Sequence, residues 1–122
     1  MPSLHRLATF SVNGATRYGY IAGGGIVDLS ARFAKEYPTL REVIAGGALT
    51  KLAEEGARHS PDFALDVITW QPPIPAPEKI ICIGVNYPDR NAEYKDGQDA
   101  PKYPSMFMRT PRSFVGDRKS VV

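Results

Sequence analysis

Residues 6–21 read RLATFSVNGATRYGYI, and this stretch decides how the chain begins to fold. Aromatic and β-branched side chains on both sides of Asn13-Gly14 favour strands over 6–12 and 16–21. Asn and Gly both tolerate positive φ, so the pair favours a tight turn. The sequence therefore predicts a β-hairpin at the start of the chain.

A third strand is expected directly after the hairpin. Gly23-Gly24-Gly25 leads into Ile26-Val27-Asp28-Leu29, in which three of the four residues are apolar. A phosphate-binding loop would need a Lys-Ser/Thr pair or the dinucleotide glycine spacing, and both are missing. The glycines therefore predict a plain turn into a strand.

Two helices and a returning strand are expected next. Thr39 and Glu42 have the spacing of a capping box, which predicts a helix ending at Gly46-Gly47. Residues 49–57 predict a second helix, and residues 64–70 predict a strand that rejoins the sheet. The expected buried positions are Leu40, Val43 and Ile44 in the first helix, and Leu49, Leu52 and Ala53 in the second.

Prolines divide the chain. The stretch QPPIPAP at 71–77 carries four of them, and proline fixes φ and removes a backbone donor. We therefore expect a small α+β domain over 1–70, an extended linker over 71–78, and the start of a β-rich domain over 79–122. The alternative is an extended loop inside one domain.

The second part begins with KIICIG at 79–84, a short apolar run that predicts a strand buried on both faces. Cys82 is interpreted as a small core residue. Pro88 suits the first turn of a helix. A polar, turn-rich stretch at 95–104 precedes a further strand over 105–109.

Composition excludes several classes of protein. Hydrophobic residues make up 43% and charged residues 23% of the chain, as in ordinary globular proteins. The net charge of +2 without a basic cluster argues against a nucleic-acid partner. No segment reaches the roughly 20 apolar residues that a membrane span needs, and no secretory signal is visible. The single cysteine allows no intrachain disulfide, which fits a cytoplasmic location.

Spacing alone identifies no catalytic motif: HExxH, CxxC, GxSxG and the phosphate loop are all missing. His5 and His59 are interpreted as surface or structural histidines without nearby partners. Arg90 and Glu93 lie three residues apart on one face of the expected helix. They could point together into a cleft or form a surface pair.

Two segments resemble the signature of the fumarylacetoacetate hydrolase superfamily. They are KIICIGVNY at 79–87, continued by Asp89 and Glu93, and MFMRTPRSFVG at 106–116. The family patterns GxNYxDHxxE and FxKPxSSxxG are matched at Gly84, Asn86, Tyr87, Asp89, Glu93, Phe107, Ser113 and Gly116. Residues 1–70 are similar to the small N-terminal domain of that family.

This resemblance implies an enzyme acting on small anionic 2-oxo or diketo acids, in aromatic-compound catabolism. It implies Mg or Mn, bound by a Glu-x-Glu pair and a later Asp, and a homodimer in the complete enzyme. The sequence contains no Glu-x-Glu. We therefore expect the metal ligands beyond Val122, none in this chain, and no activity from this chain alone.

The resemblance also assigns roles. It implies Glu93 as general base and Tyr87, Arg109 and Ser113 as substrate-binding residues. Arg90 stands where the family has histidine and cannot relay a proton, so we expect it to bind a substrate carboxylate. This favours an isomerase, hydratase or decarboxylase over a C–C hydrolase. The alternative is a non-catalytic folding or oligomerisation module whose exposed strand edges associate.

Overall fold

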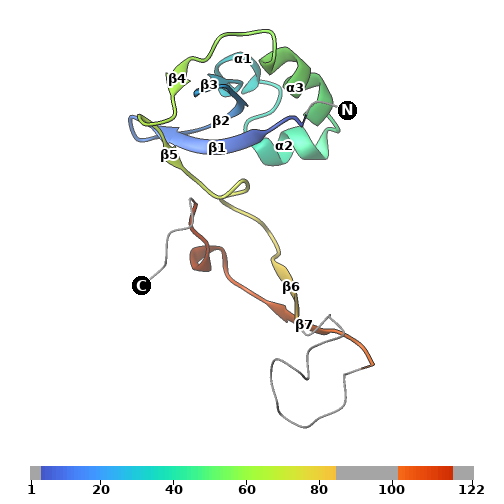
Figure 1. Ribbon diagram of the computed structural model, residues 1–122. Coiled ribbons are helices and arrows are strands. Elements are labelled where there is room, and N and C mark those ends of the chain that lie inside the picture. Colours follow the sequence, from blue (N-terminus) through green and yellow to red (C-terminus); the bar gives the residue numbers. More distant parts are fainter. Residues whose placement is uncertain (1–3, 85–101, 117–122) are drawn as a thin grey trace. The chain divides into compact units, whose positions relative to one another are not determined.

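The computed structural model describes residues 4–84 and 102–116 (Figure 1). These residues form two compact units. The first unit comprises residues 4–75 and 114–116, and the second comprises residues 76–84 and 102–113. The first contains a five-stranded sheet with three helices, and the second contains a two-stranded ribbon. The expected α+β class is confirmed.

The predicted hairpin is present. Strands β1 (Leu7–Val12) and β2 (Ala15–Ala22) pair antiparallel. Asn13 and Gly14 between them have φ values of 50° and 77°, which is the left-handed turn geometry that this pair tolerates. Strand β3 (Gly25–Asp28) then pairs with the other edge of β2, as the glycine turn predicted.

Three short helices follow: α1 (Ser30–Phe33), α2 (Leu40–Ala45) and α3 (Leu49–Gly56). The capping box at the start of α2 is confirmed, with the Thr39 hydroxyl accepting from the Arg41 N–H at 3.2 Å. Helix α1 was not predicted, because four residues are too few to show a helical period.

The expected burial of both helices is partly wrong. Ile44 and Leu49 are 45% and 39% exposed. A helix of six or eight residues turns only a narrow stripe toward the sheet, and Val43 and Leu52, both fully buried, already occupy it.

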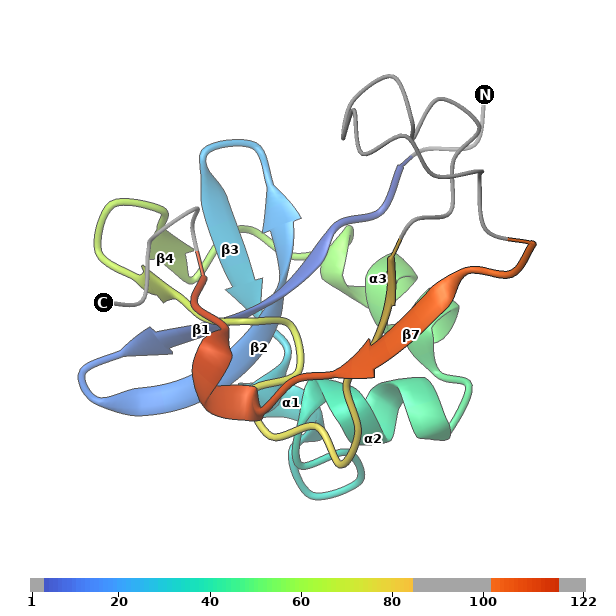
Figure 2. The ribbon, with the colours of Figure 1, turned by 90° about the horizontal axis from the view of Figure 1, so that it is seen from below.

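The core of the first unit has two layers, one on each face of the sheet. One face packs against the helices, which lie on the same side of the sheet in Figures 1 and 2, and the buried cluster there includes Tyr18, Val43 and Leu52. The other face packs against residues 63–70 around the fully buried Phe10. Both faces of this small sheet are therefore covered.

The strand expected over 64–70 is wrong. It is two short strands, β4 (Phe63–Ala64) and β5 (Thr69–Trp70), and these pair with β3 and β1 at opposite edges of the sheet. Four strand spacings would separate the edges of a flat sheet by about 19 Å. The five steps from Ala64 to Thr69 span at most about 17 Å, and a turn shortens them, since the Val67 N–H donates to the Ala64 carbonyl at 3.4 Å. The sheet must therefore curl.

The second unit contains strands β6 (Ile81–Gly84) and β7 (Ser105–Met108) and a 3₁₀ turn over Pro111–Ser113. Both strands were predicted. The expected burial of β6 on both faces is wrong, because Ile81 and Ile83 are 62% and 52% exposed. Within the described residues β6 has only β7 as a neighbour, and one strand covers neither face.

None of the helices in residues 4–84 and 102–116 is long and apolar enough to cross a membrane.

Candidate functional site

The structure describes two of the five predicted site residues. Arg109 and Ser113 lie in the second unit, at the end of β7 and in the turn that follows. Tyr87, Arg90 and Glu93 lie outside the described residues, as does the expected helix after Pro88. The predicted pairing of Arg90 with Glu93 therefore stays a prediction.

Arg109 follows β7 directly and extends its pairing with β6. Its backbone N–H donates to the Ile80 carbonyl at 3.2 Å, one residue before β6 begins. Alternate residues of a strand point to the same face, so Arg109 shares a face with Phe107 and Cys82. The side chain is exposed. A permanently charged fork in this position can bind a carboxylate in bidentate fashion.

Ser113 closes the turn after Arg109. Its hydroxyl donates to the Thr110 carbonyl at 2.7 Å, and its backbone N–H donates to the same carbonyl at 3.0 Å. The hydroxyl proton is thus used within the turn. In this geometry Ser113 can accept a hydrogen bond from a ligand, but it can donate one only by giving up the bond to Thr110.

The described residues do not fit a magnesium site. No group of three or more His, Cys, Asp or Glu side chains gathers within 4–84 and 102–116. Hard divalent cations need several converging oxygens. The Asp28 carboxylate instead binds the Arg17 guanidinium at 2.7 Å, and Glu55 binds His59 at 2.9 Å.

Asp28 and Asp62 anchor a polar network in the first unit. Asp28 is 3% exposed, and besides Arg17 it accepts from the Ala31 N–H at 3.1 Å. The Asp62 carboxylate accepts from the Asp28 N–H at 2.7 Å and from Arg32 at 3.1 Å. Burial alone would raise the pKa of Asp62, but these hydrogen bonds hold the pKa below its ordinary value. The network joins β2, β3 and α1, so its role is structural.

The interpretation of His59 as a residue without a partner is wrong. Its Nε2 lies 2.9 Å from a carboxylate oxygen of Glu55. That hydrogen bond is the main reason why the pKa of Glu55 lies below its ordinary value. The spacing of four residues was the available signal, because such residues are neighbours on a helix surface.

The glycine of the second family segment also has a packing explanation. A Cβ added to Gly116 would lie 2.5 Å from the Trp70 carbonyl oxygen and 3.0 Å from the Gln71 carbonyl carbon. The backbone at 116 therefore packs directly on the residues that follow β5. Only a residue without a side chain allows that approach.

Comparison with known proteins gives a consistent family. The chain is 30% identical over 102 residues to the mitochondrial oxaloacetate tautomerase Fahd2a of Rattus norvegicus. The matched stretch covers 82% of this chain and 32% of that protein. It is 35% identical over 96 residues to the mitochondrial oxaloacetate tautomerase fahd2 of Xenopus laevis, covering 77% of this chain and 30% of that protein. The chain thus spans about a third of the length of these relatives.

A solved structure agrees on the fold. The crystal structure of a protein assigned as HpcE from Mycobacterium smegmatis superposes with a TM-score of 0.69 at 23% identity. The match covers 95% of this chain and 40% of that one. No family model matches the sequence.

The fold and the relatives define the class as that of the fumarylacetoacetate-hydrolase-domain proteins. The chain belongs to the fumarylacetoacetate hydrolase superfamily.

Proposed function

We propose that this chain is part of an enzyme that isomerises or hydrates a small 2-oxo acid, with keto–enol tautomerisation as the first candidate reaction. One observation carries the proposal: the match to oxaloacetate tautomerases extends over 82% of the chain. Decarboxylation and C–C hydrolysis are the less favoured reactions within the same family.

The chemistry of such a substrate suits the residues of the second part. A four-carbon 2-oxo diacid carries two carboxylates, and each is best held by a guanidinium fork. Arg109 and Arg90 are the proposed partners. Ser113 would accept from the enol hydroxyl, because its own proton is held by Thr110. Tyr87 completes the proposed contacts.

Tautomerisation needs one base beside the carbon that loses a proton. Glu93 is the proposed base: its carboxylate takes a proton from the carbon next to the oxo group, and the protonated carboxyl then gives that proton to the enolate oxygen, which yields the enol and regenerates the ionised Glu93. An arginine at 90 favours ionised Glu93 and cannot carry a proton itself. A reaction that only moves a proton on the substrate tolerates an arginine at position 90 better than a reaction that must activate water.

Mg or Mn, a homodimer and a cytoplasmic location belong to the proposal for the complete enzyme. The steps above use only residues of this chain. The metal would stabilise enolate charge when bound.

A chimera tests the proposal. Residues 1–122 replace the matching third of the rat tautomerase, and oxaloacetate tautomerisation is followed by the absorbance of the enol. The chimera is expected to be active and Glu93→Gln to abolish turnover. Asp66→Asn, an exposed carboxylate in the first unit, serves as control. A folded chimera without activity, or one indifferent to Glu93→Gln, contradicts the proposal.

A further inference from the structure

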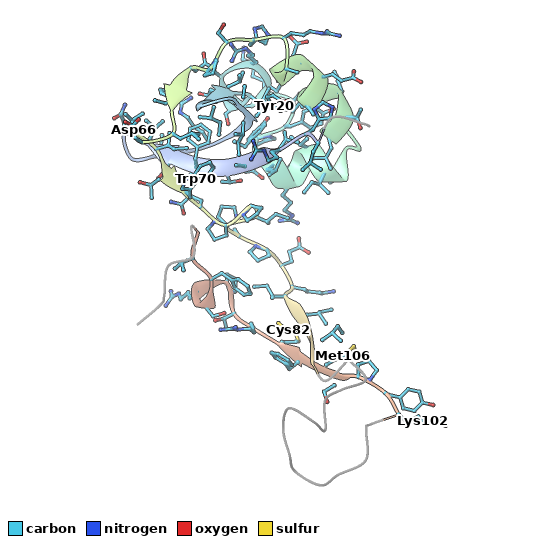
Figure 3. All side chains as sticks on the ribbon, viewed as in Figure 1. Tyr20, Asp66, Trp70, Cys82, Lys102 and Met106 are labelled. Atoms are coloured by element: carbon cyan, nitrogen blue, oxygen red, sulfur yellow. The ribbon has the colours of Figure 1, made fainter. Side chains whose placement is uncertain are left out.

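Trp70 presents its backbone to the outer side of the five-stranded sheet. It lies in β5, the edge strand that pairs with β1 in the described residues (Figure 3). Trp70 pairs with Phe10, and the N–H of the next residue, Gln71, donates to the Thr9 carbonyl. In an antiparallel ladder this pattern marks Phe10–Trp70 as a pair without direct hydrogen bonds. The N–H and C=O of Trp70 therefore point away from β1.

The backbone that follows Trp70 is held firmly to β1. The Gln71 N–H donates to the Thr9 carbonyl at 3.0 Å, and the Gln71 side-chain amide donates to the Ser11 hydroxyl at 3.3 Å. The buried Thr9 hydroxyl donates to the Pro73 carbonyl at 2.6 Å. Three hydrogen bonds thus fix this stretch, so the Trp70 carbonyl is part of a rigid surface.

Gly116 packs against this carbonyl, and both residues belong to the first unit. A Cβ at position 116 would lie 2.5 Å from the Trp70 oxygen, whereas ordinary contacts begin at 3.4 Å. Because the opposing atoms are fixed backbone, the chain at 116 would have to move by about 0.9 Å to make room for a side chain.

Gly116 follows closely after the turn that carries Ser113. The Cα atoms of the two residues can be at most about 11 Å apart, since only three residue steps separate them. The Ser113 N–H and hydroxyl both donate to the Thr110 carbonyl, at 3.0 and 2.7 Å, so the turn moves as one piece. A displacement at 116 is therefore passed on to Ser113.

We propose that Gly116 is a positioning residue. It fastens the chain to the outer side of β5 and so fixes where Ser113 presents its acceptor oxygen to the substrate. The binding role of Ser113 rests on the proposed function, whereas the fastening is a property of the fold alone. A misplacement of about 1 Å can lower an enzymatic rate about a hundredfold, so the missing side chain at 116 matters for the reaction as well as for packing.

Limited trypsin digestion of the 122-residue chain tests the fastening. Gly116→Ala should speed cleavage after Arg112, which lies in the same turn as Ser113, by at least about tenfold, because the turn opens more often. Gly24→Ala is the matched control: its added Cβ would meet nothing within 4 Å, so cleavage should proceed as in wild type. A Gly116→Ala chain that is cut after Arg112 at the wild-type rate overturns the proposal.

A second comparison separates positioning from a plain loss of stability. Gly56→Ala places its methyl group against Tyr20, so it disturbs the packing of α3 on β2. In the tautomerase chimera, Gly116→Ala should raise KM for oxaloacetate at least about tenfold and change kcat less, since Glu93 is untouched. Gly56→Ala should lower the thermal midpoint and leave KM as in wild type.

Equal rises in KM for Gly116→Ala and Gly56→Ala would show a structural role only and overturn the proposal. An inactive chimera with glycine at 116 would instead contradict the proposed function, and the binding role of Gly116 would fall with it. The trypsin rates decide the fastening in either case, because they need no activity.

Discussion

At the scale of single residues, Asp28 is a charged group that is buried and hydrogen-bonded. It is 3% exposed, and its carboxylate holds both Arg17 and the Ala31 N–H. Removing its charge leaves the guanidinium, whose side chain is 35% exposed, without its partner. Asp28 therefore connects β2 to the start of α1.

We predict that Asp28→Asn lowers the free energy of unfolding by about 1.5–3 kcal/mol, the range for hydrogen bonds to charged groups. Urea unfolding followed by the fluorescence of Trp70, the single tryptophan, measures this. Asp66→Asn removes an exposed carboxylate and should change stability by less than about 0.5 kcal/mol. Equal effects of the two substitutions would contradict a structural role for the Asp28–Arg17 ion pair.

Arg90 is predicted to bind a carboxylate of the substrate. In the tautomerase chimera, Arg90→Ala should weaken 2-oxo acid binding about tenfold to a hundredfold, through loss of a charge-assisted contact of about 1.5–3 kcal/mol. Arg90→Lys should also weaken binding, because a point charge does not replace the fork. Arg90→His should leave carboxylate binding no better than wild type. Steady-state KM and kcat decide: if Arg90→Ala changes neither, Arg90 does not bind substrate.

Only part of the candidate site could be predicted from the sequence. The apolar pattern predicted a strand over 105–109, and the strand ends one residue earlier, at Met108. The hydrogen bond of the Ser113 hydroxyl to the Thr110 carbonyl was not predicted. Nor was the Gly116 contact, since it joins residues 70 and 116, which are distant in sequence. Tyr87, Arg90 and Glu93 rest on the family resemblance.

At the scale of elements, the sequence predicted the structures that depend on neighbouring residues. The turn of the hairpin and the capping box each depend on residues within four positions of one another, and both are present. The strand over 64–70 failed because its division depends on two different partners, β3 and β1. The prediction that Ile81 and Ile83 are buried was wrong for a related reason. An apolar run indicates that a strand is suited to burial, but whether it is buried depends on which other segments pack on the sheet.

The capping box allows a test at the level of one helix. Thr39→Ala removes the hydroxyl that accepts from the Arg41 N–H and bonds the Glu42 carboxylate. We predict a loss of about 1 kcal/mol in the free energy of unfolding. The control is Thr50→Ala at an exposed position in α3, where alanine is at least as good a helix former. A Thr39→Ala variant as stable as wild type would show that the cap contributes nothing measurable.

At the scale of the whole molecule, stability should depend on pH at both extremes. The Thr39 hydroxyl holds the pKa of Glu42 below its ordinary value, as His59 does for Glu55. Together with Asp62, whose pKa is also lowered, these groups stabilise the fold fully above their unfolded pKa near 4. That contribution disappears as the pH falls through the lower folded values. Urea midpoints should therefore decrease below about pH 4, and constant midpoints down to about pH 2 would contradict this.

Tyr18 contributes to the loss of stability at alkaline pH. Burial, reinforced by nearby carboxylates, raises the pKa of its hydroxyl to about 12, and the hydroxyl donates to the Tyr37 carbonyl at 2.6 Å. The folded state thus favours the neutral phenol. Its contribution is complete below the unfolded pKa of about 10 and is lost as the pH rises toward 12. Tyr18→Phe should reduce this alkaline loss.

The division into two units predicts where a protease should cut the chain first. Residues up to 73 are fastened to β1, because the Gln71 N–H donates to the Thr9 carbonyl at 3.0 Å and the Thr9 hydroxyl donates to the Pro73 carbonyl at 2.6 Å. Along the chain, the first boundary between the two units falls between Pro75 and Ala76. Backbone beyond that point is expected to be accessible.

Trypsin should therefore cut first at Lys79, beside the proline linker, or at Lys95 or Lys102 in the polar stretch. The internal control is Arg41, an exposed basic residue inside α2. Its backbone is protected by the helix, whose opening requires the buried Leu40 and Val43 to leave the core. Mass spectrometry of early digests identifies the order of cuts. A first cut after Arg41 would mean that α2 opens more readily than the linker, and residues 1–70 would then not form a domain.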